Sequence, residues 1–335
     1  MADNLYVHFP FCRSRCSYCS LYSRTGASAA DRAAYVARIA GDIARTFGSR
    51  GAKTLSTVYF GGGSPALCDL APLKGALAPL LGEDTEFTVE LHPLDVTSAK
   101  LDELMSIGAN RISMGVQSLD DGVLRAMGRG YAAADAARAF ALAKSRFGNA
   151  GVDLIVGYPG DSVNWLGSLR DWGLAHCSAY SLQNERGLKG VPDDDAVLDR
   201  IRAVAAFLKA LGLERYEISN YALPGFECRH NFAVWRGEDY IGLGEGACGR
   251  EGLRRTRVTK GGCETSEATP EEDLKERTLF RLRTRDGIDP ARFPEWTPVL
   301  DGFAAEGLLE KQSGPVYLLT ERGTEVCDSI LAELV

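Results

Sequence analysis

Three cysteines crowd into eight residues near the start of the chain. Cys12, Cys16 and Cys19 have the spacing C-x3-C-x2-C and follow an apolar run that ends at Phe9. Three thiolates on one loop can hold three irons of a [4Fe–4S] cluster and leave the fourth iron open to another ligand. A structural zinc site needs four ligands, so zinc here would require a distant Cys or His. The spacing therefore favours an iron–sulfur site, with zinc as the main competing metal.

The other cysteines do not suggest a disulfide framework. The chain has nine cysteines, an odd number, and in a reducing compartment close-set cysteines are more often metal ligands or redox groups than bridges. We expect four scattered ones to be small buried hydrophobic residues: Cys68, Cys177, Cys263 and Cys327. Cys228 and Cys248 are set apart because they lie near other candidate site residues.

A glycine triplet and several polar residues occur where predicted strands end. Gly61–Gly63 follow an apolar run, and either a tight turn or a close approach of the backbone to a ligand explains them. Glu90, Gln117 and Asp153 recur with the same rhythm. In a parallel barrel, side chains at such positions converge on one mouth. Their recurrence favours a ligand pocket, in which Arg129 could pair with a carboxylate or hydroxyl.

Short apolar runs alternate with helical patterns over the first two-thirds of the chain. Six runs predict strands, at residues 5–9, 58–60, 87–90, 112–116, 152–156 and 179–182. A helix after a cap at Ser28 or Asp31 is predicted by apolar residues at every fourth position, namely Tyr35, Ile39, Ile43 and Phe47. A second helical face is formed by Ile201, Val204, Leu208 and Leu211. This alternation is typical of βαβ units, so an α/β barrel, complete or partial, and a doubly wound sheet both fit.

The last third of the chain has a different pattern. Residues 224–262 are rich in glycine and aromatic residues, and a boundary is expected near 265–270. Beyond it we expect helices at about 271–284 and 296–306 and a short hairpin near 315–319, an order that resembles a winged-helix fragment.

Composition and charge narrow the classes of function. The chain has 335 residues, 45% hydrophobic and 25% charged, with 38 Lys and Arg against 45 Asp and Glu, a net charge of −7. Such a composition is that of a globular protein, and the acidic balance disfavours nucleic acid as the main partner. No apolar run approaches the roughly 20 residues that span a bilayer, and Met1–Asn4 does not begin a signal peptide. The expected location is the cytoplasm.

The cysteine loop and its flanking motifs resemble the radical S-adenosylmethionine (SAM) superfamily. The closer similarity is to the oxygen-independent coproporphyrinogen III oxidase branch, which includes the HemW-type heme chaperones. The matching segments are residues 6–19, 59–65, 108–118, 153–160 and 216–222. The resemblance implies a partial (β/α)6 barrel over residues 1–222, a connecting segment over 223–268 with an HNxxVW motif, and a small, mainly helical, winged-helix-like domain over 269–335.

The resemblance also implies two cofactors and their ligands. Cys12, Cys16 and Cys19 would bind the [4Fe–4S] cluster, whose open iron would take the amino and carboxylate groups of SAM. The implied SAM-binding residues are Tyr6, Tyr18, Gly62, Gly63, Ser64, Glu90, Gln117, Arg129 and Asp153. We expect the glycine turn to offer amides to the methionine end, and Glu90 and Asp153 to accept from an ammonium or from ribose hydroxyls.

Two departures separate the chain from the oxidases of this branch. Those enzymes carry a fourth cysteine two positions after the third, where this chain has Leu21, and an N-terminal extension, whereas four residues precede Leu5 here. Coproporphyrinogen III oxidase activity is therefore not expected. The heme-chaperone branch is favoured instead, with heme passed to acceptor proteins. The rival interpretation is a radical enzyme acting on an unidentified substrate, of porphyrin type or not. A zinc protein on a similar barrel is the third interpretation.

The heme-chaperone resemblance centres on His230. Its imidazole is a natural axial ligand for heme iron, although a structural hydrogen bond is the alternative role. The family usually reads H-N-x-x-Y-W here and G-P-G-A-H further on, where this chain has Val234, Glu245 and Cys248. Cys228 adds a thiol beside the motif. The other histidines, His8, His92 and His176, are interpreted as structural.

Overall fold

Six parallel strands form the centre of the molecule in a computed structural model that describes residues 2–48 and 54–335. They are β1 (Asn4–Phe9), β2 (Thr57–Gly62), β3 (Glu86–Leu91), β4 (Arg111–Gln117), β5 (Asn149–Val156) and β6 (His176–Ser181). Neighbours in sequence are neighbours in the sheet, and each pair is parallel. All six predicted strands are confirmed. Most of their residues are buried, as is usual for parallel strands.

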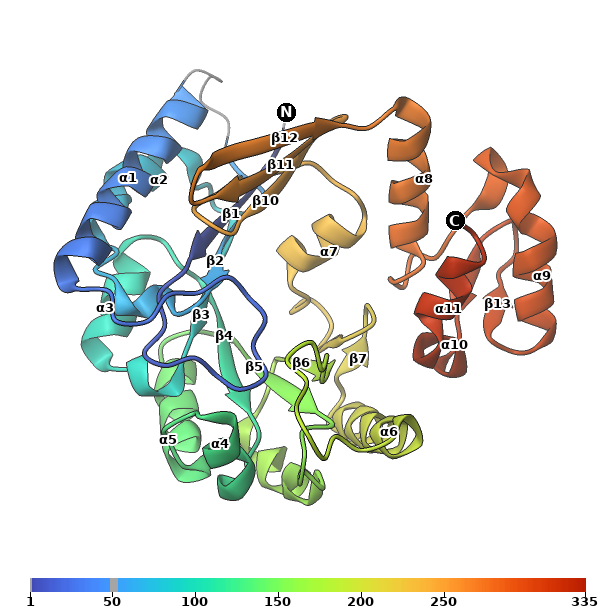
Figure 1. The fold of residues 1–335 in the computed structure, drawn as a ribbon, viewed down its shortest axis with the longest axis horizontal. Coiled ribbons are helices and arrows are strands. Elements are labelled where there is room, and N and C mark those ends of the chain that lie inside the picture. The colour runs from blue at the N-terminus through green and yellow to red at the C-terminus, as the bar shows by residue number, and fades with distance from the viewer. Residues whose placement is uncertain (1, 49–53) are drawn as a thin grey trace.

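Helices cover the outer face of these strands (Figure 1). They are α1 (Ala29–Gly48), α2 (Lys74–Leu77), α3 (Ser98–Ser106), α4 (Asp121–Met127), α5 (Ala133–Lys144) and α6 (Asp194–Ala210). The predicted apolar face of α1 is buried, and its start is fixed by a reciprocal pair in which the Asp31 amide donates to Ser28 Oγ and the Ser28 amide donates to Asp31 Oδ2. Short 3-10 turns occur at 65–67, 71–73, 78–80, 93–95, 164–172, 290–292 and 294–296.

The sheet is open, as expected for a partial barrel. Its order is β12-β11-β10-β9-β1-β2-β3-β4-β5-β6-β8-β7, so β6 pairs with β8 instead of closing on β1. The two short strands beyond β6 are β7 (Glu214–Arg215) and β8 (Asn220–Ala222). The partial barrel is confirmed, and the doubly wound alternative is not what the chain adopts.

Residues 223–268, expected to be a connecting segment, extend the sheet beyond β1. β9 (Tyr240–Leu243) runs parallel to β1, and β10 (Cys248–Glu251), β11 (Arg254–Thr259) and β12 (Gly262–Glu267) follow antiparallel. The same segment contains α7 (Arg229–Trp235), which packs against β2 and lies within the curve of the sheet (Figure 1). Residues from this segment therefore reach the interior face of the barrel.

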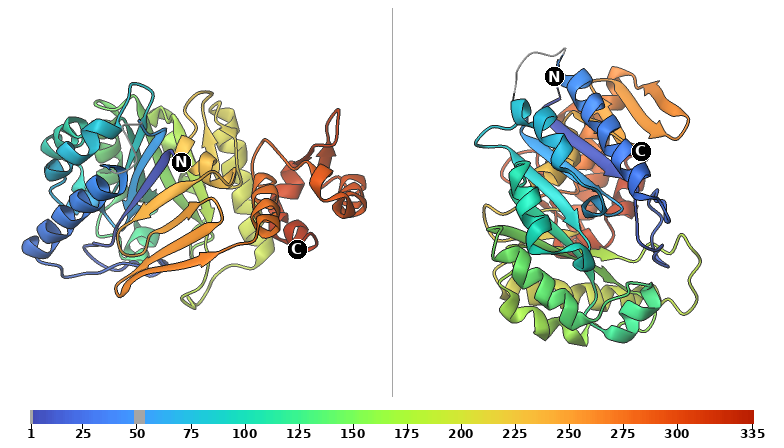
Figure 2. Two further views of the ribbon diagram at one scale, coloured as in Figure 1. Left: turned by 90° about the horizontal axis from the view of Figure 1, so that it is seen from above. Right: turned by 90° about the vertical axis from the view of Figure 1, so that its left-hand side faces the viewer.

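The C-terminal residues have a hydrophobic core of their own. They form α8 (Pro270–Arg281), α9 (Thr297–Ala305), the hairpin β13 (Leu309–Lys311) and β14 (Tyr317–Leu319), α10 (Glu321–Glu325) and α11 (Cys327–Ala332). Leu282, Trp296, Leu300 and Ile330 belong to this second core, apart from the barrel core. Figure 2 shows the unit set to one side of the sheet. The two helices and the hairpin are confirmed; the winged-helix likeness and the domain limits stay predictions.

Within the described residues, none of the helices has the length and apolar content to cross a membrane.

Candidate functional site

The cysteine loop connects β1 to α1 and is fastened at its ends and in its middle. The Cys12 amide donates to the Arg24 carbonyl (2.9 Å) and the Arg24 amide to the Pro10 carbonyl (2.5 Å), so the loop closes on itself. In its middle, the Ser17 amide donates to the Met127 carbonyl (3.1 Å) at the end of α4. The loop is thus held over the carboxyl ends of the strands.

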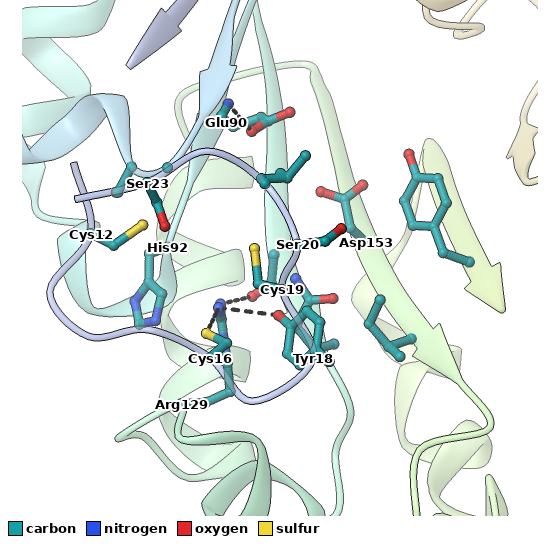
Figure 3. Close-up of a pocket in the computed structure, with 18 of the residues that line it drawn as sticks. Cys12, Cys16, Tyr18, Cys19, Ser20, Ser23, Glu90, His92, Arg129 and Asp153 are labelled. Carbon is teal, nitrogen blue, oxygen red and sulfur yellow. Dashed lines mark hydrogen bonds between the residues drawn. The ribbon is translucent and has the colours of Figure 1, made fainter. Parts of the chain in front are cut away.

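Beneath this loop lies a cavity of about 530 Å³, which we call the cysteine pocket. All three cysteines line it, together with eight of the nine residues expected to bind SAM: Tyr18, Gly62, Gly63, Ser64, Glu90, Gln117, Arg129 and Asp153. Figure 3 shows Cys12, Cys16 and Cys19 on one side and Glu90 and Asp153 farther along the strands. The ninth, Tyr6, lies in a neighbouring pocket described below.

The three thiols are half-buried and free. Burial raises the pKa of Cys12 and Cys19. Within residues 2–48 and 54–335, no three His, Cys, Asp or Glu side chains gather at a point where one ion could be held. The fit to a cluster rests on the donor set, three thiols on one loop at the wall of a single cavity, and a cubane distributes its ligands over several irons.

Arg129 lies under the loop and is 8% exposed. Its Nη1 is 3.5 Å from both Cys16 Sγ and the Tyr18 hydroxyl, and its Nη2 donates to the Gly115 carbonyl (2.6 Å). Arg129 therefore holds Cys16 and Tyr18 in place and supplies positive charge to the site.

The glycine turn is required by packing, and its amides are already used. Gly62 has a φ of +102°, and a Cβ there would lie 2.5 Å from the His8 ring. The Gly62 amide donates to Glu90 Oε2 (3.0 Å), and the Gly63 and Ser64 amides donate to the Phe9 and Phe11 carbonyls (2.7 Å each). The expectation that these amides face a ligand is therefore wrong.

Two half-buried carboxyls, Glu90 and Asp153, lie on β3 and β5. Burial and then the charge of Asp153 raise the pKa of Glu90 to about 7. Burial raises the pKa of Asp153, although Ser113 Oγ donates to its carboxylate (3.0 Å). A cationic ligand between them would relieve the cost of ionising both groups. The pair is suited to a positively charged ligand.

Gln117 has an unusual backbone conformation and a buried side-chain oxygen that could accept a hydrogen bond from a ligand. Its φ is +69°, a conformation that non-glycine residues rarely adopt, and a bulge shifts the register of β4 beside it. Its Oε1 is buried at the cavity wall and has no hydrogen-bond partner among residues 2–48 and 54–335. Such an orphaned acceptor, with the two carboxyls, fits a ligand that carries several donors, as SAM does.

Asp95 was not singled out from the sequence, yet it joins the loop to the turn. It is 6% exposed, and it accepts from Arg13 Nε (2.7 Å) and from Ser64 Oγ (2.5 Å). Glu245, although distant in sequence, also fastens the loop. The Tyr22 hydroxyl donates a hydrogen bond to it (3.0 Å), and Arg38 forms an ion pair with it (3.3 Å). The unusual Glu245 thus has a structural explanation.

A second cavity of about 420 Å³ adjoins the first, and we call it the histidine pocket. His230 on α7 lines it, together with five aromatic residues, Tyr6, Tyr59, Tyr180, Trp235 and Tyr240, and with polar residues that include Glu90, Glu217, Asn220 and Asn231. Four residues line both cavities: Tyr59, Glu90, Tyr180 and Ser219. The two pockets are therefore neighbours across a shared wall.

A chain of hydrogen bonds fixes the proton on the His230 ring. Asn4 Nδ2 donates to the Asp239 carbonyl (3.1 Å), which leaves Asn4 Oδ1 to accept from the Thr57 hydroxyl (2.8 Å). Because that bond uses the only hydroxyl proton of Thr57, the Thr57 oxygen can only accept a hydrogen bond from His230 Nδ1 (2.7 Å). Nε2 therefore carries the lone pair, and among the described residues no hydrogen bond engages it.

Burial also keeps this imidazole neutral. It lowers the pKa of His230 to about 3, with Arg111 contributing. The ring is 4% exposed and lies 5.1 Å from Tyr59 and 6.2 Å from Tyr6, measured between ring centroids. Both the structural hydrogen bond and a free ligand nitrogen occur in one side chain, so the two roles weighed for His230 do not exclude each other.

The remaining candidate residues separate into pocket and core. Val234 and Cys248 line the histidine pocket. Cys228 is fully buried and its Sγ lies 3.6 Å from Glu86, so it is not a pocket thiol as the sequence suggested. Cys263 is exposed, contrary to expectation, because β12 is an edge strand with every side chain in solvent.

The other three histidines have structural contacts. His8 lies between the Tyr6 hydroxyl (3.0 Å) and the Tyr22 carbonyl (2.8 Å). His92 Nδ1 accepts from the Leu94 amide (3.2 Å), and His176 Nε2 lies 2.8 Å from the Tyr216 hydroxyl. These contacts agree with the structural role predicted for each.

Known proteins resemble this chain over its whole length. The model of the radical SAM superfamily matches residues 6–172. The heme chaperone HemW of Escherichia coli K12 is 31% identical, the match covering 98% of this chain and 97% of that protein. Radical S-adenosyl methionine domain-containing protein 1, mitochondrial, of Bos taurus is 33% identical over 99% of this chain and 87% of its own length. The solved structure of coproporphyrinogen III oxidase (HemN) from Escherichia coli matches with a TM-score of 0.84 at 20% identity, covering 99% of this chain and 89% of that one, a likeness of fold.

Proposed function

The chain belongs to the HemW-like branch of the radical SAM superfamily, and from that premise we propose that it is a heme chaperone. In this proposal it binds one heme in the histidine pocket and passes it to acceptor proteins. The free thiols and odd cysteine count favour a reducing compartment, and we propose the cytoplasm.

The observation that carries the proposal is the state of His230. A neutral imidazole whose Nδ1 is held by a hydrogen bond and whose Nε2 lone pair is free has the form of an iron ligand. Around it, Tyr6, Tyr59 and Tyr240 offer flat apolar faces against which a porphyrin can pack. The pocket thus provides the two things heme needs, an axial nitrogen and an aromatic wall.

The cysteine pocket belongs to the same proposal. Membership of the radical SAM superfamily implies a [4Fe–4S] cluster and SAM, and Cys12, Cys16 and Cys19 would hold the cluster. When bound, that pair supplies one-electron cleavage of the sulfonium. The chain's own residues do the positioning: Arg129 fixes the loop, Glu90 and Asp153 accept from cationic and hydroxyl donors, and Gln117 Oε1 accepts a further donor.

A second candidate function is favoured by the wall that the two pockets share. A molecule beside His230 would be separated from the cysteine pocket by Tyr59 and Glu90, close enough for a radical enzyme to act on it. Such an enzyme would release 5′-deoxyadenosine in the presence of its substrate. The heme chaperone instead retains heme in a fixed ratio without turnover.

The proposal is tested by an anaerobic hemin titration of the cluster-reconstituted protein, followed at the Soret band. We expect saturation at one heme per chain for the wild type and loss of that saturable shift in His230→Ala. His230→Gln, which retains a polar group toward Thr57 but not the imidazole, serves as the packing control and should also lose it, with iron and sulfide content unchanged in both. Unsaturable binding by the wild type would reject the chaperone, and 5′-deoxyadenosine release dependent on an added substrate would favour the enzyme.

A further inference from the structure

The strands beside His230 place their side chains on one face of the sheet. In the register, Tyr6 lies opposite Tyr59 on β2 and opposite Gly242 on β9, and Asn4 lies opposite Thr57 and Tyr240. Residues directly opposite one another point to the same face. This is the face on which His230 is held, since its ring bonds to Thr57 and lies over Tyr59.

Cys248 lies at the end of the same row. Arg250 pairs with Tyr240 across β9 and β10, so two residues earlier Cys248 comes opposite Gly242, on the face shared by Tyr6 and Tyr240. Because Gly242 has no side chain, the backbone of Cys248 packs directly over it. A Cβ at Gly242 would meet the Cys248 carbonyl, so that position is held as glycine by packing.

Three further observations place the thiol at the pocket. Cys248 lines the same 420 Å³ cavity as His230, and it is exposed, whereas Cys228 beside the motif is buried. Burial and then the charge of Cys248 raise the pKa of Tyr240, which lines the same cavity. Within the described part of the chain, Cys248 Sγ has no hydrogen-bond partner that would hold it away from the cavity. The pocket therefore has two groups that bind iron, one nitrogen and one sulfur.

We propose that Cys248 is a second iron ligand of the histidine pocket, so that heme bound there is held by the His230 imidazole and the Cys248 thiolate. This inference rests on the proposed heme-chaperone function. Coordination forms an Fe–S bond and releases the thiol proton to solvent, and no electron is transferred. Thiolate prefers ferric over ferrous iron because it donates charge to the metal. The heme would therefore be held more firmly when oxidised than when reduced.

The test compares hemin titrations of the wild type, Cys248→Ser and Cys263→Ser under anaerobic conditions, with the bound species examined by electron paramagnetic resonance. Cys263 is the matched control because it is an exposed thiol on the neighbouring hairpin that lines none of the cavities described here. We expect a low-spin ferric signal of thiolate type in the wild type and in Cys263→Ser. Cys248→Ser should lose that signal and bind ferric heme at least tenfold more weakly. Reduction by dithionite should weaken binding in the wild type more than in Cys248→Ser.

Each outcome separates the two proposals. Saturable binding whose spectrum and affinity are unchanged in Cys248→Ser would overturn the thiolate ligand and leave the chaperone intact. Loss of the signal in Cys263→Ser as well would also overturn it, since the effect would then belong to thiols in general. An absence of saturable heme binding in the wild type would reject the chaperone, and the Cys248 ligand with it.

Discussion

The Tyr59 hydroxyl donates a 2.8 Å hydrogen bond to Glu90 Oε1, and both side chains line the cysteine pocket and the histidine pocket at once. The same Tyr59 ring lies 5.1 Å from His230. One hydrogen-bonded pair thus forms the partition between the proposed SAM site and the proposed heme site. The charge on Glu90 therefore affects the electrostatic environment of both pockets.

The affinity for SAM should depend on pH through Glu90. Its pKa is raised to about 7, so the carboxyl is protonated below that pH and cannot accept from the SAM ammonium as a carboxylate. We expect affinity to rise with pH, by at most about tenfold per unit, and to level off above pH 7. Glu90→Gln should bind more weakly at pH 8 and have little slope. Calorimetry between pH 5.5 and 8 on wild type, Glu90→Gln and Glu310→Gln, an exposed glutamate on β13, checks this. Equal slopes in all three would contradict it.

Loss of any one loop thiol should abolish the cluster. Cys12, Cys16 and Cys19 line one cavity, and a cluster held by three thiols needs each of them. Replacing each by Ala should reduce iron and sulfide in the reconstituted protein to near zero. Cys263→Ala should retain both. Full iron and sulfide in any of the three loop variants would refute the assignment.

The elements that form the centre of the fold were predictable because short stretches of sequence, apolar runs and apolar periodicity, determine them. Six apolar runs became β1 to β6, and the four-residue spacing of Tyr35, Ile39 and Ile43 became the buried face of α1. Polar residues at the strand ends converge because parallel strands all end at the same edge. Eight of the nine residues implied by the family resemblance consequently line one cavity.

What was missed depends on contacts between distant residues or on exposed strands. β11 and β12 carry charged and polar side chains without an apolar face, so no alternation marks them. Asp95 bonds to Arg13, 82 positions earlier, and Glu245 to Arg38, 207 positions earlier, and no local pattern reveals such a pairing. The SAM-binding role of Tyr6 stays a prediction, and its ring packs beside His230.

Asp95 should be worth more to stability than an exposed aspartate. It is buried and accepts from both Arg13 and Ser64, so Asp95→Ala should lower the free energy of unfolding by about 1.5–3 kcal/mol. Asp102→Ala is the control, since its pair with Arg146 is exposed on both sides and contributes about 0–1 kcal/mol. Urea denaturation of the apoproteins measures both. Comparable losses in the two variants would show that Asp95 does not fasten the loop.

Gly62 should tolerate no side chain. A Cβ there would lie 2.5 Å from a His8 ring that is held on both sides by hydrogen bonds, and the φ of +102° is strained for alanine. Gly62→Ala should cost roughly 2–4 kcal/mol of unfolding free energy, from overpacking and backbone strain together. At Gly75 an added Cβ would meet no atom of the described residues within 4 Å apart from its own helix backbone and chain neighbours, so Gly75→Ala should be neutral or slightly stabilising in α2. Thermal melts of the two variants measured in parallel test this prediction. Equal melting temperatures for Gly62→Ala and Gly75→Ala would contradict the close contact at Gly62.

Thr57 should raise the affinity for heme through its hydrogen bond with His230, without contacting heme itself. Its hydroxyl accepts from His230 Nδ1 and thereby keeps Nε2 unprotonated, a positioning role that makes the imidazole a better donor to iron. Thr57→Val is nearly isosteric, so it should leave the fold and the cluster in place.

We expect heme affinity to fall about 10–100-fold in this variant, the usual effect of removing a hydrogen bond behind a metal ligand. Thr88→Val is the matched control, because Thr88 is also fully buried, on the adjacent strand β3, and bonds to Arg111 instead of to His230. Hemin titrations and melting curves of both variants separate the two effects. A similar loss of stability in both, with loss of heme affinity in Thr57→Val alone, is the expected result. Unchanged heme affinity in Thr57→Val would mean that His230 does not ligate iron through the tautomer that Thr57 selects.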